Sequence, residues 1–128
     1  MRIVFAVSVL FLCALCPRVM AGEVYFMPLH FETYLPVTKE NIAPSGIKPC
    51  ALEKVGTLQA VIDASSKTQD KFSDFRVRVK IVESEKSVFI DANGVIDGDL
   101  NGLKIEESSL VTILGAHSHC GFGVNARK

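Results

Sequence analysis

The clearest alternation of apolar and polar residues in this 128-residue chain lies between residues 75 and 81. Two sets of side chains alternate there, Phe75, Val77, Val79 and Ile81 in one set and Arg76, Arg78 and Lys80 in the other. A period of two sends successive side chains to opposite faces of a β-strand. The pattern therefore predicts a half-buried strand over 75–81.

Residues 51–66 have helical periodicity instead. Their apolar side chains fall on one broad face of a helix, and they are Leu52, Val55, Leu58, Val61 and Ile62. This spacing predicts an amphipathic helix over 51–66.

A second, shorter helix is predicted over 106–114. Acidic residues open its first turn, and Leu110, Ile113 and Leu114 recur at helical spacing. Gly115 follows at a position where glycine commonly ends a helix. A strand through 110–114 is the alternative, with a poorer alternation of apolar residues.

Three further strands are predicted over 24–31, 87–91 and 103–105. Pro28 lacks an N–H donor, which favours an edge position for the first of them. Asn-Gly pairs at 93–94 and 101–102 supply the positive φ that tight turns between strands require. The sequence therefore predicts a meander of short strands between the two helices.

Residues 35–49 form a predicted loop that contains three prolines and a glycine, Pro36, Pro44, Gly46 and Pro49. Loops of this length are uncommon in compact domains unless they bind something. We treat this loop as an interaction candidate, beside the alternative that it is an ordinary connection.

The order of elements predicts the α+β class, with a mainly antiparallel sheet of about four strands and two helices in a single globular domain over 22–128. Residues 75–114 combine a basic strand, an Ile-Asp-Ala-Asn-Gly turn, a short strand and a terminal helix. This third of the chain resembles the periplasmic part of the ExbD/TolR family. Members of that family keep an N-terminal membrane helix with an acid inside it. The N-terminal segment here has no acid, and the resemblance implies no function.

The first 21 residues have the pattern of a secretory signal peptide. Arg2 supplies the positive start, and Ile3–Cys16 is apolar except for Ser8. A transmembrane helix needs roughly 20 such residues, so this run is short for a membrane span. Val19 and Ala21 suit cleavage before Gly22. An uncleaved anchor and a lipidated cysteine are the weaker alternatives.

Removal of the leader changes the charge of the chain. Arg2 and Arg18 leave with it, so 12 Lys and Arg remain against 14 Asp and Glu, a net charge of −2. This value gives no electrostatic footprint for nucleic acid or for an anionic membrane. We therefore expect an exported protein, periplasmic or extracellular, that has no stable membrane span after cleavage and does not bind nucleic acid.

Cleavage also removes two of the four cysteines. Cys50 and Cys120 remain, and a pair of cysteines in an oxidising compartment most often forms a disulfide. We expect this bridge to tie the C-terminal tail to the start of the first helix. A reactive thiol is the alternative.

Two groups of residues are candidate metal ligands. Asp97, Asp99, Asn101 and Gly102 match the opening of a calcium-binding loop, but Ser108 stands where such loops carry a bidentate Glu. His117 and His119 would point the same way in an extended tail, as ligands of zinc or copper do. Hairpin turns and surface histidines are the structural alternatives, and no cofactor is predicted.

The basic set Arg76, Arg78 and Lys80 is a candidate surface for an acidic partner, beside the alternative of a solvated sheet face. No catalytic motif stands out. The leading hypothesis is a small non-catalytic binding protein whose partner is another protein, in the form of an inhibitor or immunity-type protein of the bacterial envelope. A secreted metal-binding module is one alternative. A small secreted hydrolase is the other, which a pocket joining a histidine to a carboxylate would favour.

Overall fold

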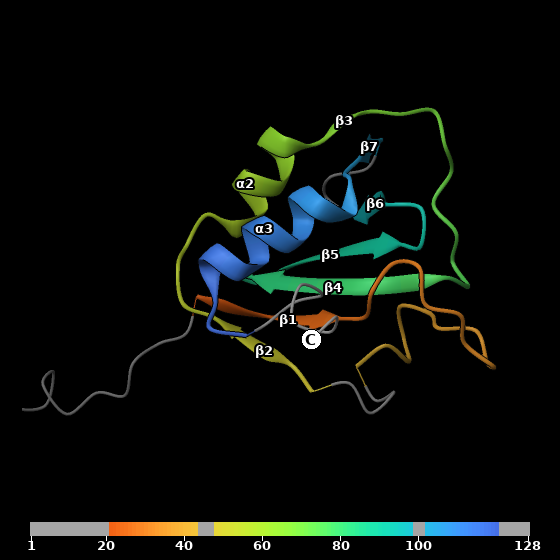
Figure 1. Cartoon of the computed structure of the whole chain (residues 1–128), viewed down its shortest axis with the longest axis horizontal. Coiled ribbons are helices and arrows are strands. Elements are labelled where there is room, and N and C mark those ends of the chain that lie inside the picture. The colour runs from red at the N-terminus through yellow and green to blue at the C-terminus, as the bar shows by residue number, and fades with distance from the viewer. Residues whose placement is uncertain (1–20, 44–47, 99–101, 121–128) are drawn as a thin grey trace, which may run out of the picture.

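The structure is a computed structural model that describes residues 21–43, 48–98 and 102–120 (Figure 1). The predicted leader lies outside these ranges except for Ala21, so its cleavage stays a prediction. Within the described ranges, no helix is both long enough and apolar enough to cross a membrane.

Seven antiparallel strands form one sheet, in the order β2-β1-β4-β5-β6-β7-β3. Their bounds are β1 Gly22–Phe26, β2 Cys50–Leu52, β3 Ser66–Lys67, β4 Val77–Glu83, β5 Lys86–Asp91, β6 Val95–Gly98 and β7 Leu103–Lys104. The α+β class and the antiparallel sheet are confirmed, but the sheet has more strands than the four expected. The strands that the pattern missed, β2, β3 and β6, have two to four residues each, too few for a visible alternation.

Two helices, α2 (Thr57–Ala64) and α3 (Glu107–His117), lie on the same face of the sheet (Figure 1). The main core lies between them and the strands, and its buried side chains include Leu58, Val61, Leu110, Leu114, Val24, Val79, Ile81, Val88 and Ile90. The predicted second helix is confirmed. It continues past Gly115 to His117, so the glycine does not end it.

The first helix is shorter than predicted, because the residues before it belong to the sheet. Leu52 lies in β2 opposite Gly22 of β1, and its side chain is buried in the main core. Gly56 stands immediately before α2 with a φ of 90°, a left-handed conformation that favours glycine. The apolar residues over 51–66 therefore belong to two elements, a short strand and a helix. Periodicity alone does not distinguish a short strand from the first turn of a helix.

The first strand is also shorter than predicted, and it is not at an edge. β1 ends at Phe26 and lies between β2 and β4. Pro28 comes after the strand and so takes no part in its pairing. The missing N–H donor of the proline is therefore consistent with the end of β1, and it does not place β1 at an edge of the sheet.

A β-bulge interrupts the alternation in β4. Val77 pairs with Asp91 and Val79 with Ile90, so two steps along β4 match one step along β5. The extra residue, Arg78, reverses the phase of the side chains. Val79 faces the helices, whereas Val77 packs on the opposite face of the sheet. The predicted strand over 75–81 is confirmed from Val77 onward, but Val77 and Val79 do not share a face.

The long irregular segment covers part of this opposite face. Val37 and Ile42 are buried there against Val77, with Tyr25 and Phe89 of neighbouring strands packed around them. The described residues of the predicted loop, 35–43 and 48–49, contain no helix and no named strand. The prediction of an irregular segment is confirmed for these residues, and residues 44–47 lie outside the described part.

A carboxylate from the sheet caps the first helix. Glu83, at the end of β4, is 8% exposed, and its two oxygens accept hydrogen bonds from the backbone N–H groups of Gly56, Thr57 and Leu58 at 2.9, 3.1 and 3.1 Å. These donors at the N-terminus of α2 have no partner within the helix. A negative charge there is also favoured by the helix dipole. Glu83 therefore fixes where α2 begins relative to the sheet.

Replacing this carboxylate should destabilise the fold. We expect Glu83→Gln to lower the free energy of unfolding by about 2 kcal/mol, because charge-assisted hydrogen bonds to three backbone donors are weakened. Urea denaturation of the mature chain measures this value. The matched control is Glu85→Gln, an exposed residue in the adjacent turn, which should change it by less than about 0.5 kcal/mol. Equal effects of the two variants would contradict the capping role.

The predicted pairing of Cys50 with Cys120 is confirmed in the structure. Cys50 and Cys120 form a disulfide with their Cα atoms 6.2 Å apart. The bridge joins the segment after α3 to β2, and not to the start of a helix as expected. Next to it the N–H of Glu53 donates to the carbonyl of His117 at 2.8 Å. The end of the described chain is therefore attached to the edge of the sheet at two points.

Loss of the bridge should cost about 4 kcal/mol of stability, from the entropy of closing a loop with a sequence separation of 70. We expect the double variant Cys50→Ala/Cys120→Ala to show this decrease in urea denaturation, and reduced wild-type protein to match it. Thiol titration of the denatured, unreduced mature chain should find no free thiol. Two free thiols per chain would show that the bridge does not form.

Candidate binding surface at one end of the sheet

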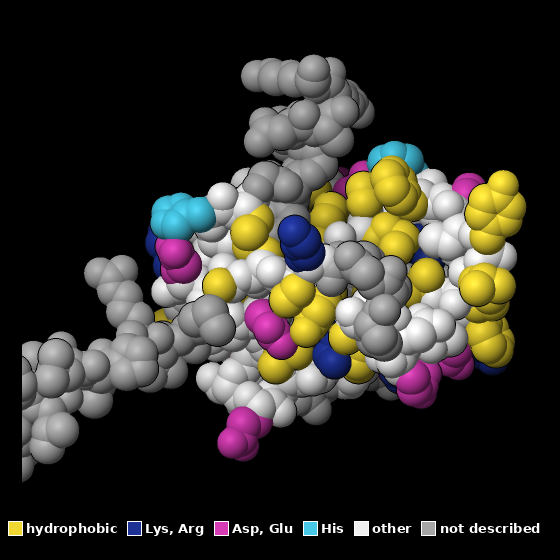
Figure 2. Space-filling view, turned by 90° about the horizontal axis from the view of Figure 1, so that it is seen from below, with side chains coloured by type: hydrophobic (Ala, Val, Ile, Leu, Met, Phe, Trp, Pro, Cys, Tyr) yellow, Lys and Arg dark blue, Asp and Glu magenta, His cyan; other side chains and the backbone are white. Residues whose placement is uncertain are grey.

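Large apolar side chains are exposed at the end of the sheet where β1 ends and β4 begins. We call Phe31, Tyr34, Leu35 and Phe75 the apolar loop surface, and their exposed fractions are 49%, 107%, 78% and 67%. Figure 2 shows hydrophobic side chains gathered on the right of the molecule, the end where Figure 1 places the segment after β1. Exposed apolar patches often mark interaction sites, so these four residues are a candidate binding surface.

Pairing between distant segments brings these residues together. Val37 forms a parallel bridge with Arg76, and the N–H of Val77 donates to the carbonyl of Val37 at 2.9 Å. Because the bridge is parallel, the residues before Val37 run beside the residues before Arg76. Leu35 and Phe75 therefore lie at the same end of the molecule, although 40 positions separate them in the sequence.

Arg78 holds the loop from the inside of the molecule. Its side chain is 2% exposed, Nε–H donates to the carbonyl of Phe31 at 3.1 Å, and Nη1 donates to the carbonyl of Val77 at 3.1 Å. Burial lowers the pKa of the Arg78 guanidinium, and the charge of Arg76 lowers it further, whereas the charges of Glu32 and Asp91 raise it. A guanidinium stays protonated through such shifts, so a buried cation links the bulge to the loop.

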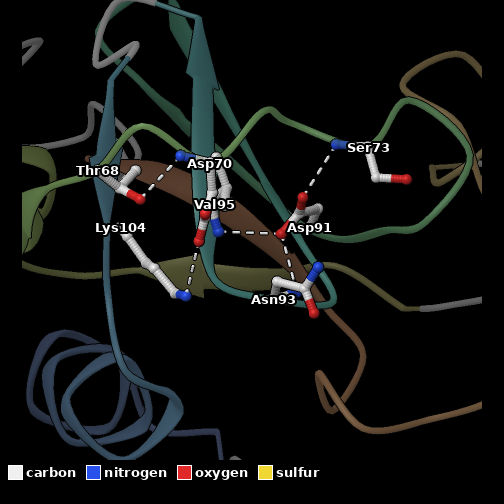
Figure 3. A network of polar contacts seen from close by, with 7 residues as sticks. All are labelled: Thr68, Asp70, Ser73, Asp91, Asn93, Val95 and Lys104. Carbon is white, nitrogen blue, oxygen red and sulfur yellow. Dashed lines mark hydrogen bonds and ion pairs between the residues drawn. The ribbon is translucent and has the colours of Figure 1, made fainter.

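A buried carboxylate fixes the other side of this end (Figure 3). Asp91 is fully buried, and its oxygens accept hydrogen bonds from the backbone N–H groups of Ser73 at 2.9 Å, Asn93 at 2.8 Å and Val95 at 2.9 Å. The bond to Ser73 anchors the segment that leads into β4, and the other two shape the turn between β5 and β6. Phe75 is therefore presented from a segment whose backbone is attached to the core.

A cavity of about 310 Å³ lies beside the loop, and its polar lining residues are His30, Asn93, Lys104, Glu106 and Glu107. Glu107 accepts a hydrogen bond from the N–H of Leu29 at 2.5 Å, and its other oxygen lies 3.6 Å from Nδ1 of His30. The cavity joins a histidine to carboxylates, as the hydrolase alternative requires. Its described lining has no hydroxyl or thiol side chain to act as a nucleophile. The Glu107 contacts orient the residues that lead into the loop.

The three basic residues considered as a partner surface have different environments. Arg76 is exposed, Arg78 is buried, and Lys80 lies over the rings of Tyr25 and Phe89 at 5.8 and 5.7 Å from their centroids. The β-bulge explains the difference, because it interrupts the alternation of side chains that the sequence predicts and leaves Arg78 buried. The three side chains do not share one exposed face.

The candidate metal ligands lie in separate places. Asp97 forms an ion pair with Lys39, and this hydrogen bond raises the pKa of Lys39. Nδ1 of His117 lies 3.0 Å from the hydroxyl of Thr57, which is fully buried. Nε2 of His119 lies 2.6 Å from a carboxylate oxygen of Glu53.

The remaining two candidate ligands, Asp99 and Asn101, lie outside the described residues. Among the residues that are described, no group of three or more His, Cys, Asp or Glu side chains is arranged to hold a metal ion. The structure therefore adds no support for a metal site at the two histidines or at Asp97.

Comparisons of the chain with protein-family models, with curated proteins and with solved structures find no match. The interpretation of the apolar loop surface therefore rests on the geometry of this chain.

The sequence pattern missed most of the apolar loop surface. The pattern predicts a strand that includes Phe31, and it predicts Phe75 on the buried face of the strand over 75–81. Leu35 opens the loop that was considered as an interaction candidate, and Tyr34 precedes it. The available signal was a run of large apolar residues that follows neither period and ends at Pro36.

The role of Arg78 can be tested with a variant that keeps its charge. We expect Arg78→Lys to lower the free energy of unfolding by about 1–3 kcal/mol, because a single ammonium cannot replace the planar donors to two carbonyls. Amide hydrogen exchange in residues 29–35 should become faster. Arg76→Lys, at an exposed neighbouring position, is the control and should leave both measurements unchanged. An unchanged exchange rate in Arg78→Lys would show that the guanidinium does not hold the loop.

Proposed function

We propose that the mature chain is an exported, non-catalytic binding protein that attaches to another protein through the apolar loop surface. Its form is that of an inhibitor or immunity-type protein, active in the periplasm or outside the cell. The observation that carries this proposal is the exposure of Tyr34 and Leu35 on a loop whose backbone is held from within.

The energetics of exposed apolar groups support a protein partner. Burying a Leu or Phe side chain in an interface contributes about 1.5–3 kcal/mol, whereas in the free protein these groups contact water. Aromatic residues are enriched in the centres of protein interfaces. A surface with three aromatic side chains and one leucine therefore has the composition of an interface core.

Export is supported by the leader pattern and by the cysteine pair. A disulfide forms and persists in oxidising compartments such as the periplasm or the extracellular space. The Cys50–Cys120 bridge suits that setting. The leader itself stays a prediction from the sequence.

The chain offers a matched pair of variants for testing the surface. Leu35 and Val55 are both 78% exposed, but Leu35 lies in the apolar loop surface and Val55 lies just before α2. We expect immobilised mature protein to retain a partner protein from envelope extract of the producing cells. Leu35→Ser should reduce the retained amount about tenfold or more, because an apolar contact is lost.

Val55→Ser is the control in the same experiment and should retain as much partner as the wild type. Both substitutions replace an exposed aliphatic side chain, so neither should change the midpoint of urea denaturation. Failure of the wild type to retain any protein at micromolar concentration, or equal losses in the two variants, would contradict the proposal.

A further inference from the structure

The two halves of the disulfide bridge have different surroundings. Cys50 is 6% exposed and belongs to the main core, in a strand that pairs with β1. Cys120 is exposed and lies in the segment that follows α3. Figure 1 places this end of the described chain beside β2. One half of the bridge is therefore packed in the interior, and the other half lies at the surface.

Hydrogen bonds that do not involve sulfur hold the segment after α3 against β2. The N–H of Glu53 donates to the carbonyl of His117 at 2.8 Å, and the hydroxyl of the buried Ser118 donates to the carbonyl of Leu114 at 2.6 Å. The same hydroxyl accepts from the N–H of Cys120 at 3.4 Å. Because none of these bonds needs the bridge, the folded chain can bring its two cysteines together while both are still thiols.

We propose that Cys120 is a site of thiol–disulfide exchange, at which an external disulfide of a small molecule or of an oxidoreductase joins the chain. Cys50 then reacts only with Cys120, within the chain. Access decides which sulfur an external thiol or disulfide reaches. A donor attached to Cys50 would occupy the main core, so β2 would have to separate from β1 first. A donor attached to Cys120 extends from the surface. This inference is independent of the apolar loop surface.

The bridge then forms in two steps. The thiolate of Cys120 attacks one sulfur of the external disulfide, so a mixed disulfide forms and the other donor sulfur leaves as a thiolate. Cys50 loses its proton and attacks the sulfur of Cys120, so the bridge forms and the second donor sulfur leaves. The two cysteines lose two electrons and two protons, and the donor is reduced to two thiols.

The first test compares two single variants of the mature chain, Cys50→Ala, which keeps only Cys120, and Cys120→Ala, which keeps only Cys50. Glutathione disulfide is the probe, and mass spectrometry measures the rate at which the glutathione adduct forms. In native buffer we expect the Cys120 thiol to react about tenfold faster or more, because the Cys50 thiol reacts only after local opening of the sheet. In concentrated urea both thiols are accessible, so the two rates should agree within about twofold.

A second probe distinguishes a small donor from a protein donor. It is a Cys-X-X-Ser variant of an oxidoreductase whose remaining active cysteine carries a thionitrobenzoate group as a mixed disulfide. We expect the same preference for Cys120, because an exposed segment is open to a protein surface. A preference seen with glutathione disulfide alone would overturn the part of the proposal that concerns an oxidoreductase.

The wild-type chain gives a measurement that does not depend on the folding of either variant. Exchange is reversible, so a thiolate that opens the native bridge attacks the sulfur of Cys120 and releases Cys50 as a thiol. After brief exposure to reduced glutathione, alkylation and peptide mapping should find glutathione on Cys120 and the alkyl label on Cys50.

Three results would overturn the proposal. The first is glutathione trapped on Cys50 of the wild type as often as on Cys120. The second is an equal rate for the two single variants in native buffer. The third is a difference in rate that persists in concentrated urea, because the preference would then come from the local sequence and not from the fold.

Discussion

The structure depends on one extra residue in β4. The bulge opposite Asp91 turns Arg78 into the interior and moves Val77 to the face of the sheet that the helices leave open. On that face Val77 gives Val37 and Ile42 an apolar site to pack against, and the loop is attached there. A regular strand would have kept Val77 on the helical face and would have left Arg78 exposed. The ordered loop and the apolar loop surface both follow from this local change of register.

Buried charges in this small domain act on backbone groups. Glu83 accepts from the start of α2, Asp91 accepts from two turns, and Arg78 donates to two carbonyls. Each buried charge is satisfied by polar groups that strands and helices leave unpaired at their ends. Buried charges with several hydrogen bonds fix the relative position of two segments. Apolar packing alone specifies this position less precisely. Buried charges are therefore suited to holding irregular segments, which form a large part of the described chain.

The sequence predicted what periodicity can show. The α+β class, the second helix, the basic strand from Val77 onward and the Cys50–Cys120 pair were all expected and are present. Elements of two to four residues were missed, because a period needs several repeats to be visible. The apolar loop surface was missed for a different reason. It depends on a bulge, a parallel bridge and a buried arginine, and the neighbours of these groups lie up to 47 positions away in the sequence.

The exposure of Tyr34 is informative because of the order beneath it. An apolar side chain on a loosely held loop can fold back onto the protein and bury part of its surface. Hydrogen bonds to the carbonyls of Phe31, Leu35 and Pro36 oppose that movement, and the side chain of Tyr34 is fully exposed in the structure. For the proposed binding function, the same bonds would reduce the conformational entropy that is lost on association, and burial of the apolar ring would add to the affinity.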